Sequence, residues 1–382
     1  MFVKVPIVIQ FLLLFSASLV LEAATVKGPP SEVTFKAVSE VQVGVFPHDL
    51  TAGDFDRDGN PDLAVVNTQS HEVSILLGNG MGNFQSKTAL ATKTAPISII
   101  AIDLNNDNAL DLIVASGTTS AVSILLGRGK GEFDLVSVLH IDGSPLGLAT
   151  GDFNHDGHLD LAVTCELAEN VSILLGKGNG LFSAPIYIAV GHHPSTVAVG
   201  HFNKDGHLDL AVGNDRSHTV SILIGMGDGT FQPQVGYVVG VFPHSIIARD
   251  FNNDGKIDLA VSNRLSNLVW ILRGEGDGTF RRDAWYRVPH VPHSVVAADF
   301  NGDGYLDLAV TSEDTNAVAV LLGKGDGTFS DQTTFQVGKR PTGIVIADFN
   351  NDGRPDIATA NSDSNNVSIL INTTAFPSRK KL

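Results

Sequence analysis

The chain is poor in cysteine and has no excess of basic residues. Only one of its 382 residues, Cys165, is a cysteine, so no intramolecular disulfide can form and the fold depends on its core or on bound metal. Lysine and arginine number 25 against 41 aspartates and glutamates, and the net charge is −16. We therefore expect no nucleic-acid partner, because phosphate contacts need a basic surface. Cys165 ends an apolar run, which predicts a small buried side chain rather than a catalytic thiol.

Long apolar runs are also scarce, with one exception at the N-terminus. Residues 5–21 are mostly apolar, follow a lysine and precede small residues, which is the pattern of a secretory signal peptide. The run is also near the lower length limit of a membrane-spanning helix. We expect residues 1–24 to be a cleaved signal peptide and 25–34 a short linker. The mature protein is then expected to be a secreted monomer (extracellular, periplasmic or at the cell surface) without a membrane span.

No segment keeps the 3.6-residue apolar period of an amphipathic helix, but one acidic pattern recurs. DFNNDGKID, which begins at Asp250, places oxygen-bearing side chains at positions 1, 3, 5 and 9 and a glycine at position 6. Calcium prefers such oxygen ligands on a sharply turned loop, although solvated turns rich in Asp, Asn and Gly are also common. Repetition favours calcium, because the pattern recurs every 49 residues, beginning at 54, 103, 152, 201, 250, 299 and 348.

The candidate calcium ligands are the side chains at positions 1, 3, 5 and 9 of the seven acidic loops. They are Asp54, Asp56, Asp58 and Asp62; Asp103, Asn105, Asp107 and Asp111; Asp152, Asn154, Asp156 and Asp160; Asn203, Asp205 and Asp209; Asp250, Asn252, Asp254 and Asp258; Asp299, Asn301, Asp303 and Asp307; and Asp348, Asn350, Asp352 and Asp356. About half of the acidic residues lie in these loops, so five to seven structural Ca²⁺ ions would offset most of the net charge. Asn108 replaces the glycine of the second loop, which weakens that site. His201 replaces the first aspartate of the fourth loop, which we expect to be weakly filled or empty.

Each 49-residue unit contains four short β-rich runs separated by turn residues. In the unit that begins at Phe231, these runs lie near 232–239, 245–248, 258–262 and 268–272. An apolar strand follows every acidic loop, which excludes helical calcium modules of the EF-hand type. Seven such units predict an all-β, seven-bladed β-propeller over residues 35–376, with four antiparallel strands per blade and a tail at 377–382. An open solenoid is the alternative, but the chain has no capping repeats.

The ends of the repeat region predict how the ring closes. An outer-strand sequence begins at Phe35, before the first acidic loop, and no outer strand follows the last unit. We therefore expect the N-terminal strand to complete the last blade.

Two phenylalanine positions and one glycine-rich turn recur with the unit. One position follows the first residue of the acidic loop, as Phe55 does. The other closes the G-x-G-x-x-F turn, as Phe84 does. An aromatic ligand cage is one interpretation, but hydrophobic wedges between blades are more common. The glycine-rich turns are interpreted as hairpin turns, since neither Lys-Ser/Thr nor a helix follows them as in a phosphate-binding loop.

These elements resemble the FG-GAP or VCBS-type repeats of integrin-α-like β-propellers. The matching residues are the D-x-[DN]-x-D-G-x-x-D loop, the DLAV strand, LLG and the G-x-G-D-G-T-F turn, and they cover nearly all of the expected mature chain. The resemblance implies calcium in the hairpin loop between the first and second strands of a blade. It implies no single activity, since such propellers occur in adhesion receptors, lectins and a few lyase or dehydratase enzymes.

Histidines gather at the opposite end of the predicted inner strands, where each unit has a proline. The candidate ligand-binding residues next to these prolines are His48, His193, His244 and His293. Polar loops expected on the same face, near the channel mouth, are 67–72, 214–219 and 263–268.

Three interpretations of these histidines remain open. They could cap loops, bind a glycan or protein partner, or form a lyase- or dehydratase-like centre with acid–base or transition-metal chemistry. The sequence contains no nucleophile–base set and no cofactor motif, so binding is favoured over catalysis.

Overall fold

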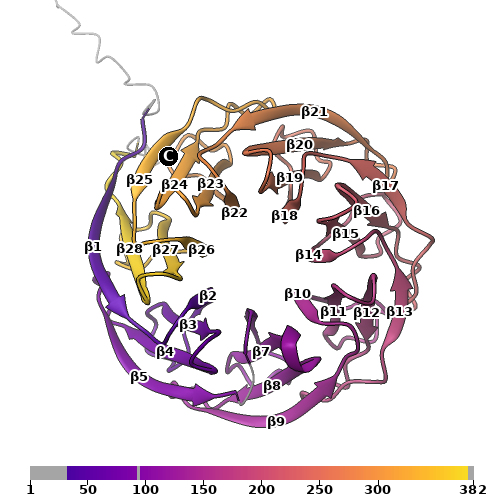
Figure 1. The fold of residues 1–382 in the computed structure, drawn as a ribbon, viewed down its shortest axis with the longest axis horizontal. Coiled ribbons are helices and arrows are strands. Elements are labelled where there is room, and N and C mark those ends of the chain that lie inside the picture. Colours follow the sequence, from indigo (N-terminus) through magenta and orange to yellow (C-terminus); the bar gives the residue numbers. More distant parts are fainter. Residues whose placement is uncertain (1–31, 93–94, 377–382) are drawn as a thin grey trace, which may run out of the picture.

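The computed structural model describes residues 32–92 and 95–376, which form a closed ring of seven four-stranded antiparallel sheets (Figure 1). The predicted signal peptide, most of the predicted linker and the predicted tail lie outside the described residues. The ring confirms the predicted seven-bladed propeller and excludes the open solenoid. No helix in the described part of the chain has the length and apolar character needed to cross a membrane.

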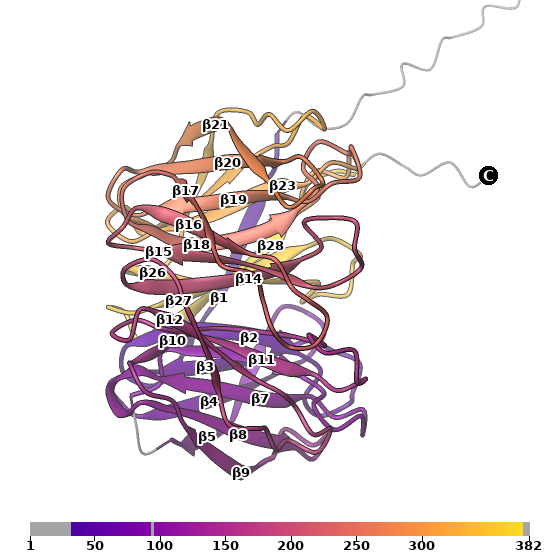
Figure 2. The same cartoon turned by 90° about the vertical axis from the view of Figure 1, so that its right-hand side faces the viewer.

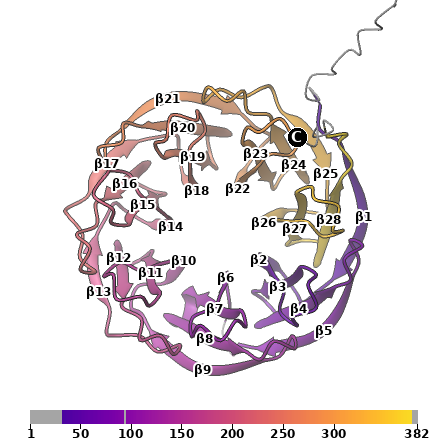
Figure 3. The same ribbon diagram turned by 180° about the vertical axis from the view of Figure 1, so that it is seen from behind.

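The four strands keep one order in every blade, counted outwards from the central axis (Figures 1 and 3). The innermost strands are β2 (Pro47–Gly53), β6 (Ser98–Ile102), β10 (Pro145–Gly151), β14 (Pro194–Gly200), β18 (Pro243–Arg249), β22 (Pro292–Ala298) and β26 (Pro341–Ala347). The second strands are β3 (Asp62–Asn67), β7 (Asp111–Ser116), β11 (Asp160–Cys165), β15 (Asp209–Asn214), β19 (Asp258–Asn263), β23 (Asp307–Ser312) and β27 (Asp356–Asn361). The third strands are β4 (Glu72–Gly78), β8 (Ala121–Gly127), β12 (Asn170–Leu174), β16 (Thr219–Leu223), β20 (Leu268–Gly274), β24 (Ala317–Leu321) and β28 (Asn366–Asn372). The outermost strands are β5 (Phe84–Ala91), β9 (Phe133–His140), β13 (Ile186–Ala189), β17 (Val235–Val238), β21 (Phe280–Arg287), β25 (Thr333–Gln336) and β1 (Phe35–Gln42). A short 3₁₀ turn, η1 (Gly117–Thr119), follows β7.

Burial explains why the strands differ in composition. Every residue of the second strands is buried, because neighbouring blades pack on both faces of the sheet, and the middle of each strand is therefore mostly apolar, as LAVV is in β3. Cys165 lies in this layer and is fully buried, as predicted. The outer strands instead alternate between exposed and partly buried residues, as in β1 and β5.

One predicted strand is shorter in the structure. The run at 232–239 contains only β17, and the equivalent strands β13 and β25 are equally short. An isolated bridge between Gly225 and Phe231 marks where pairing begins before β17. The glycine-rich turn of the next unit behaves as predicted: Gly276 and Gly278 have positive φ, and Glu275 N donates to Thr279 O.

The recurring phenylalanines are wedges between adjacent blades. The residue after the first aspartate of one blade packs edge-to-face against the turn-closing residue of the next, with ring centroids 5.2–5.7 Å apart. The pairs are Phe55–Phe133, Phe153–Phe231, Phe202–Phe280, Phe251–Phe329, Phe300–Phe35 and Phe349–Phe84. These contacts confirm the wedge interpretation and place the rings in the core rather than in a ligand cage.

The N-terminal strand completes the last blade, as predicted. β1 pairs antiparallel with β28, from Phe35 opposite Asn372 to Gln42 opposite Asn366. The ladder extends beyond the strands, because Thr373 N donates to Thr34 O at 2.8 Å. Figure 1 shows this contact as the indigo strand beside the yellow blade, so the two ends of the described chain close the ring together.

Candidate functional site

The inner strands separate two faces of the ring that carry different chemistry. Each inner strand begins at the proline end and leads into an acidic loop at its other end, as β2 leads from Pro47 to the loop at 54–62. The side view in Figure 2 shows that the strands run across the thickness of the ring. The acidic loops and the proline-linked histidines therefore lie on opposite faces, as predicted from the sequence.

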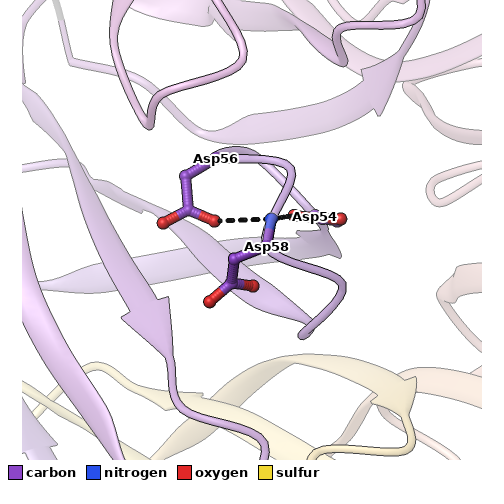
Figure 4. Close-up of side chains that lie close together, drawn as sticks. All are labelled: Asp54, Asp56 and Asp58. Atoms are coloured by element: carbon purple, nitrogen blue, oxygen red, sulfur yellow. Dashed lines mark hydrogen bonds between the residues drawn. The ribbon is translucent and has the colours of Figure 1, made fainter.

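The first acidic loop folds around its own carboxylates. Asp54 accepts hydrogen bonds from the backbone N–H groups of Asp58 at 3.1 Å and Gly59 at 2.9 Å. Asp56 also accepts from Asp58 N, at 3.2 Å. One carboxylate oxygen from each of Asp54, Asp56 and Asp58 lies within 4.8 Å of the other two (Figure 4). Positions 1, 3 and 5 therefore lie close enough together to share one cation.

The donor set of this loop fits a hard cation. All the converging atoms are carboxylate oxygens, which is the chemistry that Ca²⁺ selects. Burial, together with the negative charges of Asp58 and Asp54, raises the pKa of Asp56 above its usual value. A divalent cation would relieve this repulsion. In five other loops an asparagine at position 3 instead donates its side-chain N–H to the position-5 carboxylate, as Asn105 does to Asp107 at 2.9 Å.

The second and fourth loops differ from the pattern in distinct ways. Asn108 adopts φ 65° and its N–H donates to Asp103 at 2.8 Å, so it replaces the glycine without changing the loop. In the fourth loop His201 Nδ1 lies 2.8 Å from the carbonyl oxygen of His207, and this loop has no carboxylate at position 1. The fourth loop is thus the weakest candidate for cation binding.

The aspartate at position 9 has a structural role that the sequence did not reveal. Asp307 is fully buried, and its two oxygens accept from Phe300 N and Gly323 N, both at 2.8 Å. The other six loops repeat this pair of bonds, which ties the loop to the end of the third strand. Burial raises the pKa of Asp307 to about 7.

We predict that Asp307→Ala lowers the free energy of unfolding by about 2–5 kcal/mol even in the presence of chelator, because two buried amides lose their acceptor. Asp303→Ala is the matched control, since Asp303 lies at position 5 of the same loop and near its surface. Chemical denaturation in EDTA measures both variants. Equal stabilities of the two variants would show that position 9 acts only as a metal ligand.

The opposite face contains a cavity of about 520 Å³ at the mouth of the central channel. Residues from all seven blades line it. The four predicted ligand-binding residues, His48, His193, His244 and His293, are among them. The structure therefore brings these histidines to one cavity, although two of them are separated by 245 positions in the sequence, from 48 to 293.

Three of the histidines contact one another. His244 Nε2 lies 3.0 Å from His293 Nε2, and the rings of His48 and His293 stack edge-to-face with centroids 5.3 Å apart. His48 Nδ1 lies 2.9 Å from the carbonyl oxygen of Ile97 and donates to it. Burial lowers the pKa of His48 to about 4 and that of His293 well below 6.5, so both imidazoles are neutral at pH 7.

His193 belongs to a separate contact. Its Nε2 lies 2.7 Å from Glu166 Oε1, and its Nδ1 is buried without a hydrogen-bond partner. Glu166 also accepts a hydrogen bond from the hydroxyl of Ser144 at 3.2 Å.

Sequence reasoning placed two of the polar loops on this face but did not single out the charged residues that occupy one repeat position in them. The residue directly after the second strand lines the mouth in four blades, and these residues are Glu166, Asp215, Arg264 and Glu313. Glu313 is 5% exposed and binds two arginines: Arg264 through a pair of 3.0 Å bonds and Arg340 through one bond of 3.0 Å. Their 49-residue spacing is the signal that would have identified them.

The residues that precede the strand-opening prolines are hydrogen-bonded to the repeat position that holds these charged residues. Six residues that precede the strand-opening prolines have positive φ, namely Phe46, Ser144, His193, Phe242, Val291 and Arg340. Each of their carbonyls accepts the N–H of a residue that follows a second strand, as Val291 O does from Glu313 N at 3.0 Å. Positive φ also recurs at other turns of the unit, such as Asn253 and Asn267, so this backbone shape is a property of the repeat.

The chain is similar to known proteins both in the sequence of its repeat and in its overall fold. A family model described as FG-GAP-like repeat matches residues 54–114, 103–163, 201–261, 250–310 and 299–359. No curated protein matches. Among solved structures, BBS1N in complex with ARL6DN is 13% identical with a TM-score of 0.65, and the match covers 90% of this chain and 98% of that one.

Two further solved structures are similar to this chain in fold. A lectin from Agrocybe aegerita that recognises non-reducing terminal N-acetylglucosamine is 18% identical with a TM-score of 0.56, and the match covers 83% of this chain and 86% of the lectin. A protein from Lactobacillus plantarum is 16% identical with a TM-score of 0.63, with 79% and 88% covered. Likeness at these identities shows the fold alone. The family matches span most of the chain, and this chain therefore belongs to the FG-GAP-like repeat family.

Proposed function

We propose that this protein is an exported, calcium-stabilised binding module that holds the end of a glycan in its channel-mouth cavity. The observation that carries the proposal is the cavity itself, whose volume of about 520 Å³ falls within the usual range for small-molecule sites. The sugar-binding lectin among the solved structures supports a glycan as the ligand class. BBS1N, solved with a protein bound, makes a protein partner the alternative outcome of the test.

The polar groups of the cavity suit hydroxyl recognition. Glu313 holds Arg264 in an ion pair with two hydrogen bonds. The guanidinium is therefore already fixed in orientation, and little side-chain entropy is lost when a ligand binds. Arg340 also lies over the ring of Phe46, with its Cζ 5.5 Å from the centroid. Planar charged groups next to an aromatic ring provide both hydrogen bonds and an apolar contact for a sugar.

Calcium and export belong to the same proposal. Six acidic loops have an aspartate at position 1 and oxygen donors at positions 3 and 5, so five to seven Ca²⁺ ions would stabilise the face opposite the cavity. The apolar N-terminal run at residues 5–21 supports export, and extracellular Ca²⁺ concentrations suit modules that bind it at about 10⁻⁴–10⁻³ M.

A glycan array probed with the calcium-loaded protein tests the proposal, followed by calorimetry of the best ligand. Arg264→Met should weaken binding at least about tenfold, because a desolvated charge-assisted hydrogen bond contributes about 1.5–3 kcal/mol. Arg128→Met is the matched control, since Arg128 pairs with Asp134 on the exposed outer edge, away from the cavity. If Arg264→Met left the affinity unchanged, the cavity would not be the site. If the protein bound protein partners but no glycan on the array, the ligand would be a protein instead of a glycan.

One observation favours catalysis as a second candidate. Two imidazoles lie beside carboxylates in the cavity: His193 at 2.7 Å from Glu166 and His244 at 3.6 Å from Asp215. A carboxylate that orients an imidazole is the usual arrangement of a general base, as a lyase or dehydratase requires. Turnover of acidic polysaccharides, followed by the absorbance of unsaturated products and abolished by His193→Gln, would establish this activity.

A further inference from the structure

We propose that His244 and His293 form a binding site for a zinc-class divalent transition metal at the base of the channel-mouth cavity. The site is separate from the acidic loops, which lie on the opposite face and present mainly oxygen ligands, with histidines only in the third and fourth loops. It also does not depend on whether the cavity binds a glycan. Imidazole nitrogen is a preferred ligand of Zn²⁺, Cu²⁺ and Ni²⁺ and a poor one for Ca²⁺.

The geometry of the pair carries the proposal. His244 on β18 and His293 on β22 come from adjacent blades, and their Nε2 atoms face each other at 3.0 Å. Two nitrogens bound to one zinc ion at about 2.0–2.1 Å each would lie only slightly farther apart than this. His293 is 7% exposed, so this nitrogen pair is shielded from bulk solvent.

The outer nitrogens of both rings lie beside polar side chains, although His244 Nδ1 makes no hydrogen bond to the described residues. His244 Nδ1 faces Asp215 Oδ2 at 3.6 Å, and Asp215 in turn accepts a 2.7 Å hydrogen bond from the hydroxyl of Ser195. His293 Nδ1 lies 3.1 Å from Ser294 Oγ. Imidazoles that bind metals commonly donate from their second nitrogen to a carboxylate, which sets the tautomer and ring orientation, and Asp215 is the carboxylate nearest to His244 Nδ1 for this role.

The remaining coordination positions face the cavity. Among the described residues, no third His, Cys, Asp or Glu ligand atom lies within 4.8 Å of both nitrogens. His48 is the nearest imidazole to complete the site; its Nδ1 donates to Ile97 O, so its Nε2 carries the free lone pair. The pair therefore leaves room for water or for an oxygen of a bound ligand, as in sites with an open position.

Two other arrangements compete with this one. The 3.0 Å contact could be only a hydrogen bond in which one imidazole donates to the other. A second histidine pair, His155 Nε2 and His207 Nδ1 at 2.7 Å, lies exposed on the acidic-loop rim and could also bind transition metals. The experiment must separate all three.

Tag-free full-length protein, stripped with EDTA and dialysed into excess CaCl₂ to saturate the acidic loops, is titrated with ZnCl₂ by calorimetry. The proposal predicts a high-affinity event that His244→Gln and His293→Gln each weaken at least about tenfold, with a smaller loss for His48→Gln. The matched control, His155→Gln/His207→Gln, should leave that event unchanged. Cobalt-loaded protein should show ligand-field absorption bands that disappear in His244→Gln.

Three outcomes would overturn the proposal. The first is no zinc binding, which would make the pair a simple hydrogen bond. The second is binding that only the His155→Gln/His207→Gln variant abolishes, which would move the metal to the rim. The third is the absence of an anomalous-scattering peak between His244 and His293 in zinc-soaked crystals of the unaltered protein. This test remains available if the cavity variants fail to fold.

Discussion

Removal of calcium is expected to lower the thermal midpoint of unfolding by tens of degrees. A ligand that binds only the folded state stabilises it by about 2.7 kcal/mol per site at a hundredfold excess over the dissociation constant. Several such sites together would match the whole stability of an ordinary domain, about 5–15 kcal/mol. The chain has no disulfide to replace this contribution, since its single cysteine is buried and free. Thermal scans at increasing chelator concentration measure the effect.

Variants of single loops show whether the effect comes from the acidic loops. Asp250→Ala, in the fifth loop, should reduce the stabilisation by calcium by about one site. His201→Ala is the matched control and should leave the calcium response unchanged. His201→Asp should add a site and raise the calcium stoichiometry by one. A midpoint that does not move with chelator, or a stoichiometry that His201→Asp leaves unaltered, would contradict calcium as a structural ligand.

Deletion of the N-terminal strand is expected to unfold most of the protein or to make it aggregate. Without residues 32–42, β28 loses its only partner on the outer side and presents an open hydrogen-bonding edge. Phe35 is lost as well, which leaves Phe300 without its edge-to-face neighbour in the adjacent blade. Circular dichroism and size-exclusion chromatography of the truncated chain measure the loss.

A circular permutant distinguishes ring closure from a local defect. Thr34 and Thr373 are hydrogen-bonded, so residues 32–46 can be moved to follow β28 through a short turn, as β5 follows β4 in the first blade. This permutant should recover the stability of the original chain because it restores the same ladder. Recovery would confirm that the strand matters by closing the last blade, whereas an unchanged midpoint after simple deletion would disprove the closure role.

The periodic features of this protein were predictable because their causes are local. A 49-residue spacing, a strand after each acidic loop and phenylalanine at two fixed positions are properties of one unit, and one unit repeats seven times. Ring closure could also be predicted by counting strands. The sequence has an extra outer strand before the first unit, and the last unit lacks its own outer strand. The shortness of the outer strand β17, which β25 shares without any proline in its run, was not predicted.

The role of the position-9 aspartates was not predictable in the same way. Their spacing suggests a metal ligand, but whether a carboxylate faces the ion or the backbone depends on where the third strand ends in space. In the structure the N–H groups of Phe300 and Gly323 approach Asp307 together, and only the packed blade brings them there.

By itself, the sequence determined a seven-bladed ring with acidic loops on one face and histidines on the other. Only the tertiary structure decided which of those histidines meet: His244 and His293 touch, His48 stacks beside them, and His193 pairs with Glu166 instead. It also decided that Arg264 and Arg340 share one buried glutamate. The physical reason is that equivalent positions in a repeat have the same local conformation, whereas contacts across the channel depend on how closing the ring sets the blades against one another.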